Sequence, residues 1–291
     1  MKLIALFPLF KEAFSQFGKD RATRLAAALS YYTIFAIAPL LIIFIAIAGH
    51  FLGHGYVKGQ IIDELRGSLG PGGAQAVKTM IEAAYKPKQS VIASTISFAV
   101  FLFAAAGVFG QLQDALNTVW HVEQKAQHKI MDVIRDRFAS LAMVLGIGFL
   151  LLVTLVISAG ASALGHLITG VAPWLTVVIK IVDFILSFVV VAVLFGLIFK
   201  VLPDTRIRWK DVAIGACVTS LLFAVGVFLI GLYMGHSAVA STYGAAGSLI
   251  VILLWIYYAA QIMLFGAEFT KVYAQNHGSR SGGKQLAPGE A

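Results

Sequence analysis

Residues 109–120 read Phe-Gly-Gln-Leu-Gln-Asp-Ala-Leu-Asn-Thr-Val-Trp, and they come directly after an apolar run over residues 91–108. If one helix continues from the apolar run into this stretch, Gln113 and Asn117 share a face, because they are one turn apart. Asp114 adds a carboxylate to the same helix end. Hydrocarbon offers such groups no hydrogen-bond partner, so other parts of the protein must supply one. The stretch therefore predicts a set of membrane helices whose polar ends meet.

The composition points to the same class of protein. Hydrophobic residues make up 59% of the chain and charged residues only 12%, whereas a soluble domain carries roughly 25% charged residues. The single cysteine, Cys217, excludes an internal disulfide and a metal site built on thiolates. The net charge of +8 is explained by basic residues in the loops on one side of a membrane, so no nucleic-acid partner is expected.

Six apolar stretches are each long enough to cross a bilayer, which takes about 18 residues or more. We therefore expect an all-α polytopic membrane protein, a six-helix transmembrane bundle forming one domain over residues 1–274. The polar tail, residues 275–291, is rich in Gly and Ser and is expected to be disordered. The predicted spans are residues 25–52, 91–110, 138–164, 174–199, 212–235 and 244–269.

Two stretches outside the spans are amphipathic. From Leu9 onward, Phe10, Ala13, Phe14 and Phe17 fall on one helical face, which predicts a short N-terminal helix in the membrane interface. Residues 53–90 form the one long loop. Within it, residues 57–69 and 74–85 can each form a short helix, separated by Gly-Pro-Gly-Gly at 70–73.

The distribution of Lys and Arg predicts the orientation. Sixteen of these residues lie before the first span, in the segments 111–137 and 200–211, and from Lys271 onward, all on one side of the membrane. Five lie in the long loop on the other side. Because cytoplasmic loops carry the excess of basic residues, both termini are predicted to be cytoplasmic and the two-helix loop extracytoplasmic.

Polar residues gather at the predicted cytoplasmic ends of spans one, two and six. We expect Arg24 to pair with Asp114 or Glu268, because a lone charge near lipid is costly. The groups either hold the bundle in register and reach out to water, or form a polar vestibule that admits a headgroup or an ion. The candidates are Arg21, Arg24, Gln111, Gln113, Asp114, Asn117, Gln261 and Glu268.

Lys180 and Asp183 form a second candidate pair. They lie inside the fourth predicted span, and their i, i+3 spacing allows them to pair on one helix. Ionisable residues within a membrane span are candidates for a substrate or ion path. The alternative is a pair that satisfies itself and faces the bundle.

The remaining motifs argue against an enzyme. His50, His54, His166 and His236 lie at outward ends of spans. His50 and His54 are one turn apart and could together bind a metal or sense pH, but histidine is also an ordinary interfacial residue and the spacing of a metal-binding motif is absent. The sequence also lacks the phosphate-binding loop, the GxSxG elbow and the HExxH motif. We therefore expect no catalytic residues, no metal and no cofactor.

Four stretches resemble the YihY / virulence factor BrkB family of bacterial inner-membrane proteins. They are residues 25–39 (Leu-Ala-Ala-Ala-Leu-Ser-Tyr-Tyr-Thr-Ile-Phe-Ala-Ile-Ala-Pro), 109–120, 203–216 and 243–268. The resemblance implies six spans and an inner-membrane location. It associates the family with serum resistance and with envelope lipid handling or export. A ribonuclease label carried by some members is not expected to apply, because that chemistry needs a cluster of metal ligands.

These observations favour a transporter-like protein that moves or accommodates an amphipathic or lipid-type envelope molecule. Small residues and polar helix ends suit that function. Its expected partners are membrane lipids, an unidentified amphipathic substrate and, in a homo-oligomer, further copies of the chain. The alternative is a non-transporting envelope scaffold that acts as a virulence factor.

Overall fold

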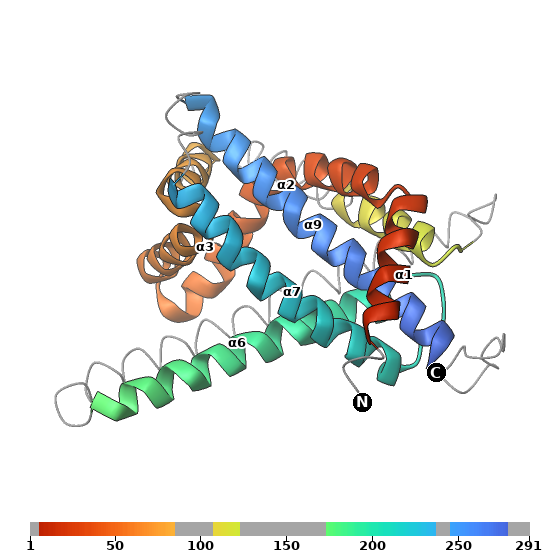
Figure 1. Ribbon diagram of the computed structural model, residues 1–291. Helices are drawn as coiled ribbons and strands as arrows, with labels where there is room; N and C mark the ends of the chain where they lie inside the picture. The colour runs from red at the N-terminus through yellow and green to blue at the C-terminus, as the bar shows by residue number, and fades with distance from the viewer. Residues whose placement is uncertain (1–5, 85–106, 123–172, 237–244, 279–291) are drawn as a thin grey trace.

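The computed structural model describes residues 6–84, 107–122, 173–236 and 245–278, and every regular element in these ranges is a helix. Residues 107–119 are also helical. The other helices in Figure 1 are α1 (Leu6–Lys19), α2 (Ala22–Leu52), α3 (His54–Ala84), α6 (Pro173–Val201), α7 (Trp209–His236) and α9 (Ala245–Asn276).

Three helices in the described ranges are long and apolar enough to cross a membrane. The apolar stretches are Phe184–Val201 in α6, Trp209–Ile230 in α7 and Leu249–Asn276 in α9. Helix α2 covers the first predicted span. The predicted span at 138–164, most of the span at 91–110 and most of the predicted tail at 275–291 lie outside the described residues.

Helices α7 and α9 pack closely through two reciprocal glycine–threonine pairs. A Cβ atom on Gly215 would overlap Thr270, and a Cβ atom on Gly266 would overlap Thr219. Each threonine lies four residues after the glycine of its own helix, so the two helices run antiparallel here. The hydroxyls of Thr219 and Thr270 donate to the carbonyls of Gly215 and Gly266, both at 2.7 Å. The small residues therefore allow close approach while the hydroxyls stay satisfied within their own helices.

Helix α1 lies across the carboxyl-terminal part of α9 (Figure 1). The ring of Phe10 lies 4.8 Å from that of Phe269, and Ala13 is fully buried beside them. Phe14 was predicted on this face, but it is 72% exposed. Phe14 follows Phe10 by four residues, which is slightly more than one turn of 3.6 residues. Its side chain is therefore rotated toward the edge of the buried face. Phe7, about two turns before Phe14, is exposed with it.

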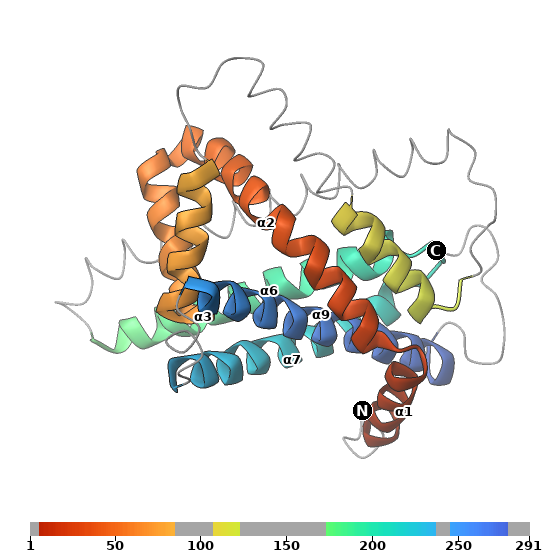
Figure 2. The same ribbon diagram turned by 90° about the horizontal axis from the view of Figure 1, so that it is seen from above.

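Helix α3 folds back on itself. The sequence predicts two separate helices here, whereas one helical element covers His54–Ala84. Lys58 Nζ nevertheless lies 2.9 Å from Glu82 Oε1, although the two residues are 24 positions apart. A straight helix would separate them by about 36 Å. The element must therefore reverse direction between these residues, and Figure 2 shows its two limbs side by side.

The largest buried apolar cluster lies where α2, α6, α7, α9 and helical residues 107–119 converge. Leu116, Phe199, Ile207 and Leu264 are fully buried in it. Each of these side chains makes many small dispersion contacts with its neighbours, which together stabilise the packing. This cluster fixes the end of the helical segment 107–119 against α9 and so positions the polar groups beside it.

Candidate functional site

A buried lysine and a buried glutamate lie one turn apart near the end of α9. Lys271 Nζ is 2.8 Å from Glu268 Oε2, with side-chain exposures of 2% and 0%. Their i, i+3 spacing places both on one helix face. That face packs against the turn between α1 and α2, where the chain places a second carboxylate.

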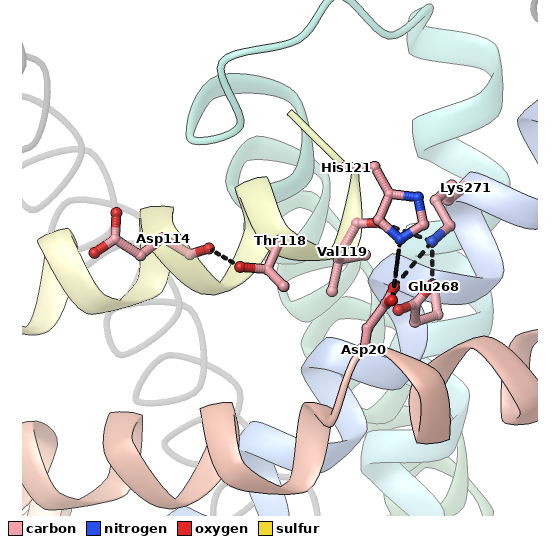
Figure 3. Close-up of polar contacts among 7 residues, drawn as sticks. All are labelled: Asp20, Asp114, Thr118, Val119, His121, Glu268 and Lys271. Carbon is pink, nitrogen blue, oxygen red and sulfur yellow. Dashed lines mark hydrogen bonds and ion pairs between the residues drawn. The ribbon is translucent and has the colours of Figure 1, made fainter. Parts of the chain in front are cut away.

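Asp20 lies between the last residue of α1 and the first residue of α2. Its Oδ2 lies 3.2 Å from Lys271 Nζ, and its side chain is 11% exposed. The same ammonium donates to the Val119 carbonyl at 2.7 Å. A lysine donates three hydrogen bonds at most. Lys271 thus donates hydrogen bonds to the α1–α2 turn and to the end of helical residues 107–119, and it forms an ion pair with Glu268 of its own helix (Figure 3).

His121 closes this group on its solvent side. The amide of His121 donates to Thr118 O and that of Val122 to Asn117 O, a pattern that ends helices with one residue in the left-handed conformation. His121 is that residue, with φ 51°. The reversal carries the ring back to Asp20, where Nε2 lies 3.0 Å from both carboxylate oxygens. The histidine side chain is 59% exposed, so it connects the buried carboxylate with water.

Asp20, His121, Glu268 and Lys271 are called the Lys271 cluster below. Burial by itself raises the pKa of Asp20, and this is the largest single effect on it. The contacts with His121, Glu268 and Lys271 together outweigh burial and hold that pKa below its ordinary value of 3.8. Asp20 is therefore a carboxylate at neutral pH, held in place by cationic and hydrogen-bonding neighbours.

A second polar contact lies on the other side of residues 107–119. Asn117 Nδ2 donates to Asp204 Oδ2 at 2.7 Å, and the Asp204 amide donates to Asn117 Oδ1 at 2.8 Å. Gln113 Nε2 lies 3.1 Å from Asp204 Oδ1. The two amides reach the same carboxylate, as their spacing of one turn predicts. Asp204 follows α6, so this contact ties α6 to the helical residues 107–119.

The other candidate residues are not part of these contacts in the described structure. Arg24 does not supply the cation beside Glu268; that cation is Lys271, and Arg24 is exposed. Asp114 is exposed, and its carboxylate points away from the Lys271 cluster (Figure 3). Arg21 is also exposed, whereas Gln111 and Gln261 are half-buried.

The remaining predictions concern side chains that the structure does not describe. Lys180 and Asp183 lie within α6, but their side chains are outside the described set. The same holds for the side chains of His50, His54 and His236, and for the whole of His166. Within the described ranges, no three His, Cys, Asp or Glu residues are grouped closely enough to hold a metal ion.

Four residues of these contacts were not among the candidates. Lys271 could have been predicted from local sequence. It follows Glu268 at i, i+3 on a helix that continues past the apolar stretch, and this spacing allows the two to pair. Asp20, His121 and Asp204 carry no such signal. Each lies in a turn or at a helix end, and its partner is far away in sequence. Asp20 is 251 residues from Lys271 and 101 from His121, and Asp204 is 87 residues from Asn117.

Comparisons with known proteins place the chain in a family. A family model described as virulence factor BrkB matches residues 13–290. A UPF0761 membrane protein of Haemophilus influenzae is 24% identical over 254 residues, covering 87% of this chain and 90% of that protein. One from Rhodospirillum centenum is 25% identical over 263 residues and covers 89% of this chain. No solved structure matches the fold significantly.

The relatives differ in length. The chain spans 56% of the Rhodospirillum protein and 59% of a Stenotrophomonas maltophilia relative, which is 25% identical over 265 residues. The family model nevertheless extends over almost the whole chain, and these relatives are named as membrane proteins. The apolar helices α6, α7 and α9 agree with that description. The chain is therefore a membrane protein of the virulence factor BrkB family.

Proposed function

We propose that this protein is a transporter-like protein of the bacterial inner membrane that moves or accommodates an amphipathic, lipid-type envelope molecule. In this proposal the chain crosses the membrane six times, and both termini lie in the cytoplasm. The support is the bias of basic residues toward one side of the predicted spans. The Lys271 cluster then lies at the cytoplasmic end of the bundle.

The observation that carries the proposal is the way one ammonium joins three separate segments. Lys271 contacts Asp20 from the α1–α2 turn and Val119 from the end of helical residues 107–119. Contacts of this kind can be exchanged for other anionic or carbonyl oxygens without a change in covalent structure. If Asp20 withdraws, an anionic headgroup can take its place on Lys271.

The surroundings of the Lys271 cluster suit an anionic headgroup. Arg21 follows Asp20 directly and Arg24 lies one helical turn further on, and both are exposed. Basic residues beside a membrane attract anionic lipid, at roughly 1 kcal/mol each. We propose that they gather the headgroup at the α1–α2 turn and that Lys271 receives it when the turn moves away from α9.

A non-transporting scaffold is the second candidate. It is favoured by the completeness of the pairing, since Lys271 has three protein contacts and Asn117 makes hydrogen bonds through both ends of its amide. A scaffold would keep these contacts permanently, whereas a transporter must break some of them during its cycle.

Reconstituted vesicles with a fluorescent lipid distinguish the two candidates. The wild-type protein should accelerate exchange of the lipid between leaflets, measured as the fraction that an impermeant quencher reaches with time. Asp20→Asn should change that rate several-fold, because it weakens the contact that holds the turn. Asp63→Asn is the matched control, since Asp63 lies on an exposed part of α3.

The same experiment can refute the transport proposal. If wild-type protein leaves the exchange rate at that of empty vesicles for anionic and zwitterionic lipids alike, lipid movement is excluded and the scaffold stands. If Asp63→Asn changes the rate as much as Asp20→Asn does, the Lys271 cluster has no special part in it.

A further inference from the structure

The Lys271 cluster holds two carboxyl groups beside one buried ammonium. Asp20 and Glu268 face a single buried ammonium, and their side chains are 11% and 0% exposed. Buried charges that lack a counter-charge are strongly disfavoured. We propose that the cluster is a proton-binding site, in which Glu268 holds the proton and His121 connects it with water.

Glu268 has an oxygen that needs such a proton. Its Oε2 forms an ion pair with Lys271 Nζ at 2.8 Å, but both of its oxygens are buried and neither has a hydrogen-bond partner among the described residues. The neighbouring polar group is the carboxylate of Asp20, which can only accept (Figure 3). Two carboxylates cannot form a hydrogen bond with each other. A proton on Glu268 turns it into a donor to Asp20 and satisfies both groups at once.

Asp20 is the less suitable of the two acids to hold the proton. Its oxygens already accept from Lys271 and lie 3.0 Å from His121 Nε2. These contacts stabilise the charged form, which is the reason why the pKa of Asp20 lies below its ordinary value. Glu268 has one cationic contact and no solvent exposure.

A metal cation fits this place poorly. The ammonium of Lys271 lies within 3.2 Å of Asp20 and 2.8 Å of Glu268, so it occupies the space between the carboxylates where a metal would sit. Two positive charges so close together would repel each other strongly. A proton needs no such space, because it is carried by an oxygen that is already present.

The elements packed around Glu268 supply no other ionisable side chain that the structure places in these contacts. The α1–α2 turn supplies Asp20, the end of helical residues 107–119 supplies His121, and α9 supplies Lys271. Helix α7 faces this part of α9 with glycine and threonine, and α1 faces it with apolar residues. The proton therefore has one described route to water, through Asp20 and the exposed ring of His121.

The role of this proton in transport rests on the proposed function. If Asp20 withdraws with the α1–α2 turn, Glu268 loses its acceptor and the cluster opens toward water, where the proton can leave. Release of the proton and opening of the turn would then be linked, as a coupling ion requires.

Infrared difference spectroscopy on the reconstituted full-length protein tests the site without any transport assay. A pH jump should give the carbonyl band of a protonated carboxylic acid, shifted by deuterium exchange. Glu268→Gln should remove this band and Glu82→Gln should keep it. Asp20→Asn should move the appearance of the band to lower pH, because without the second carboxylate Glu268 can ionise beside Lys271.

Stability gives a second, independent readout. Because Gln resembles the protonated form of Glu, Glu268→Gln should unfold at the same temperature as wild type, within a few degrees, and Glu268→Ala should unfold well below it. A band that survives in Glu268→Gln, or no band in the wild type, overturns the proton site. So does a Glu268→Gln variant that fails to fold, because a neutral isostere should be tolerated. None of these results bears on whether lipid moves.

Discussion

Lys271 is the individual residue on which the junction of α1, α2 and α9 depends. Its side chain is only 2% exposed, and it contacts Asp20, Glu268 and the carbonyl of Val119. Taking an ammonium out of water costs several kcal/mol. The cost is offset here by hydrogen bonds to Asp20 and to the Val119 carbonyl and by the ion pair with Glu268. The lysine therefore contributes through its partners rather than by itself.

Replacement of Lys271 should leave the two acids without a counter-charge. Lys271→Met keeps the length and the apolar stem of the side chain but removes its charge, and we expect a loss of about 3–5 kcal/mol in the free energy of unfolding. Thermal unfolding in detergent measures it. Lys11→Met is the control, because Lys11 is exposed on α1. Equal unfolding temperatures for Lys271→Met and wild type would contradict the importance of the cluster.

The charge on Asp20 predicts a dependence of stability on pH. Its pKa in the folded protein lies below the ordinary value of 3.8, so the unfolded chain takes up a proton first as the pH falls. The stabilisation is fully present above this value and disappears as the pH falls through the folded pKa. The stability difference between wild type and Asp20→Asn should therefore be constant from neutral pH to about pH 4 and shrink below it. A difference that shrinks already near neutral pH would show that another group controls it.

The sequence alone predicts some of the residues in these polar contacts, but few of their partners. Glu268, Gln113 and Asn117 were expected to need polar partners because they follow apolar stretches. The partners could not be derived, because Asp20 and Asp204 lie in turns whose positions depend on how the whole helices pack. Local spacing predicts which residues share a face, but it does not predict which face of another helix they meet.

The pairing of α7 with α9 is the best-defined contact between two elements. Gly215 and Gly266 each face a threonine of the other helix, with no room for a Cβ atom. Such contacts replace the hydrophobic effect, which is weak between helices in lipid. The two glycines therefore set the distance between the helices and the register of α9 that brings Lys271 to Asp20.

Adding a methyl group at this contact should be costly. Gly266→Ala forces a Cβ atom into Thr219, and we expect a loss of about 1–3 kcal/mol in the free energy of unfolding. Gly196→Ala is the matched control, because its Cβ atom would lie 3.7 Å from the nearest atom, on Ala216. Unfolding of both variants in detergent gives the comparison. The double variant Gly266→Ala/Thr219→Gly should recover part of the loss, and equal stability of the two alanine variants would refute the contact.

The helices themselves were more predictable than their contacts. The apolar stretches at 174–199 and 212–235 agree closely with α6 and α7. Helix α9 continues seven residues beyond the predicted end at 269, to Asn276, because Phe269 and Val272 pack on α1. Apolar content alone cannot show this extension, since its other faces carry polar residues. The reversal within α3 lies between Lys58 and Glu82, a range that contains the Gly-Pro-Gly-Gly break at 70–73, and buried Val57, Val77 and Ile81 pack in one cluster across it.

The whole molecule is proposed to have its Lys271 cluster on the cytoplasmic side and α3 on the other. The family assignment gives a membrane protein, and the orientation rests on the basic residues. Single cysteines in a Cys217→Ser background test it with an impermeant thiol reagent. Cysteine at Ser15 should react only in inside-out vesicles, and cysteine at Thr79 only in intact cells, because both positions are exposed. Reaction of both from the same side would contradict the topology.

The central claim is that α1 and its turn must move away from α9 for cargo to pass. Asn276 Nδ2 lies 3.0 Å from Glu12 Oε2, so cysteines at these exposed positions can be joined by a short bifunctional thiol reagent. The direct measurement is lipid exchange by Glu12→Cys/Asn276→Cys in the Cys217→Ser background, before and after joining with a cleavable reagent. The account predicts that joining abolishes the accelerated exchange and that cleavage restores it. Exchange at the same accelerated rate in the joined protein would contradict it.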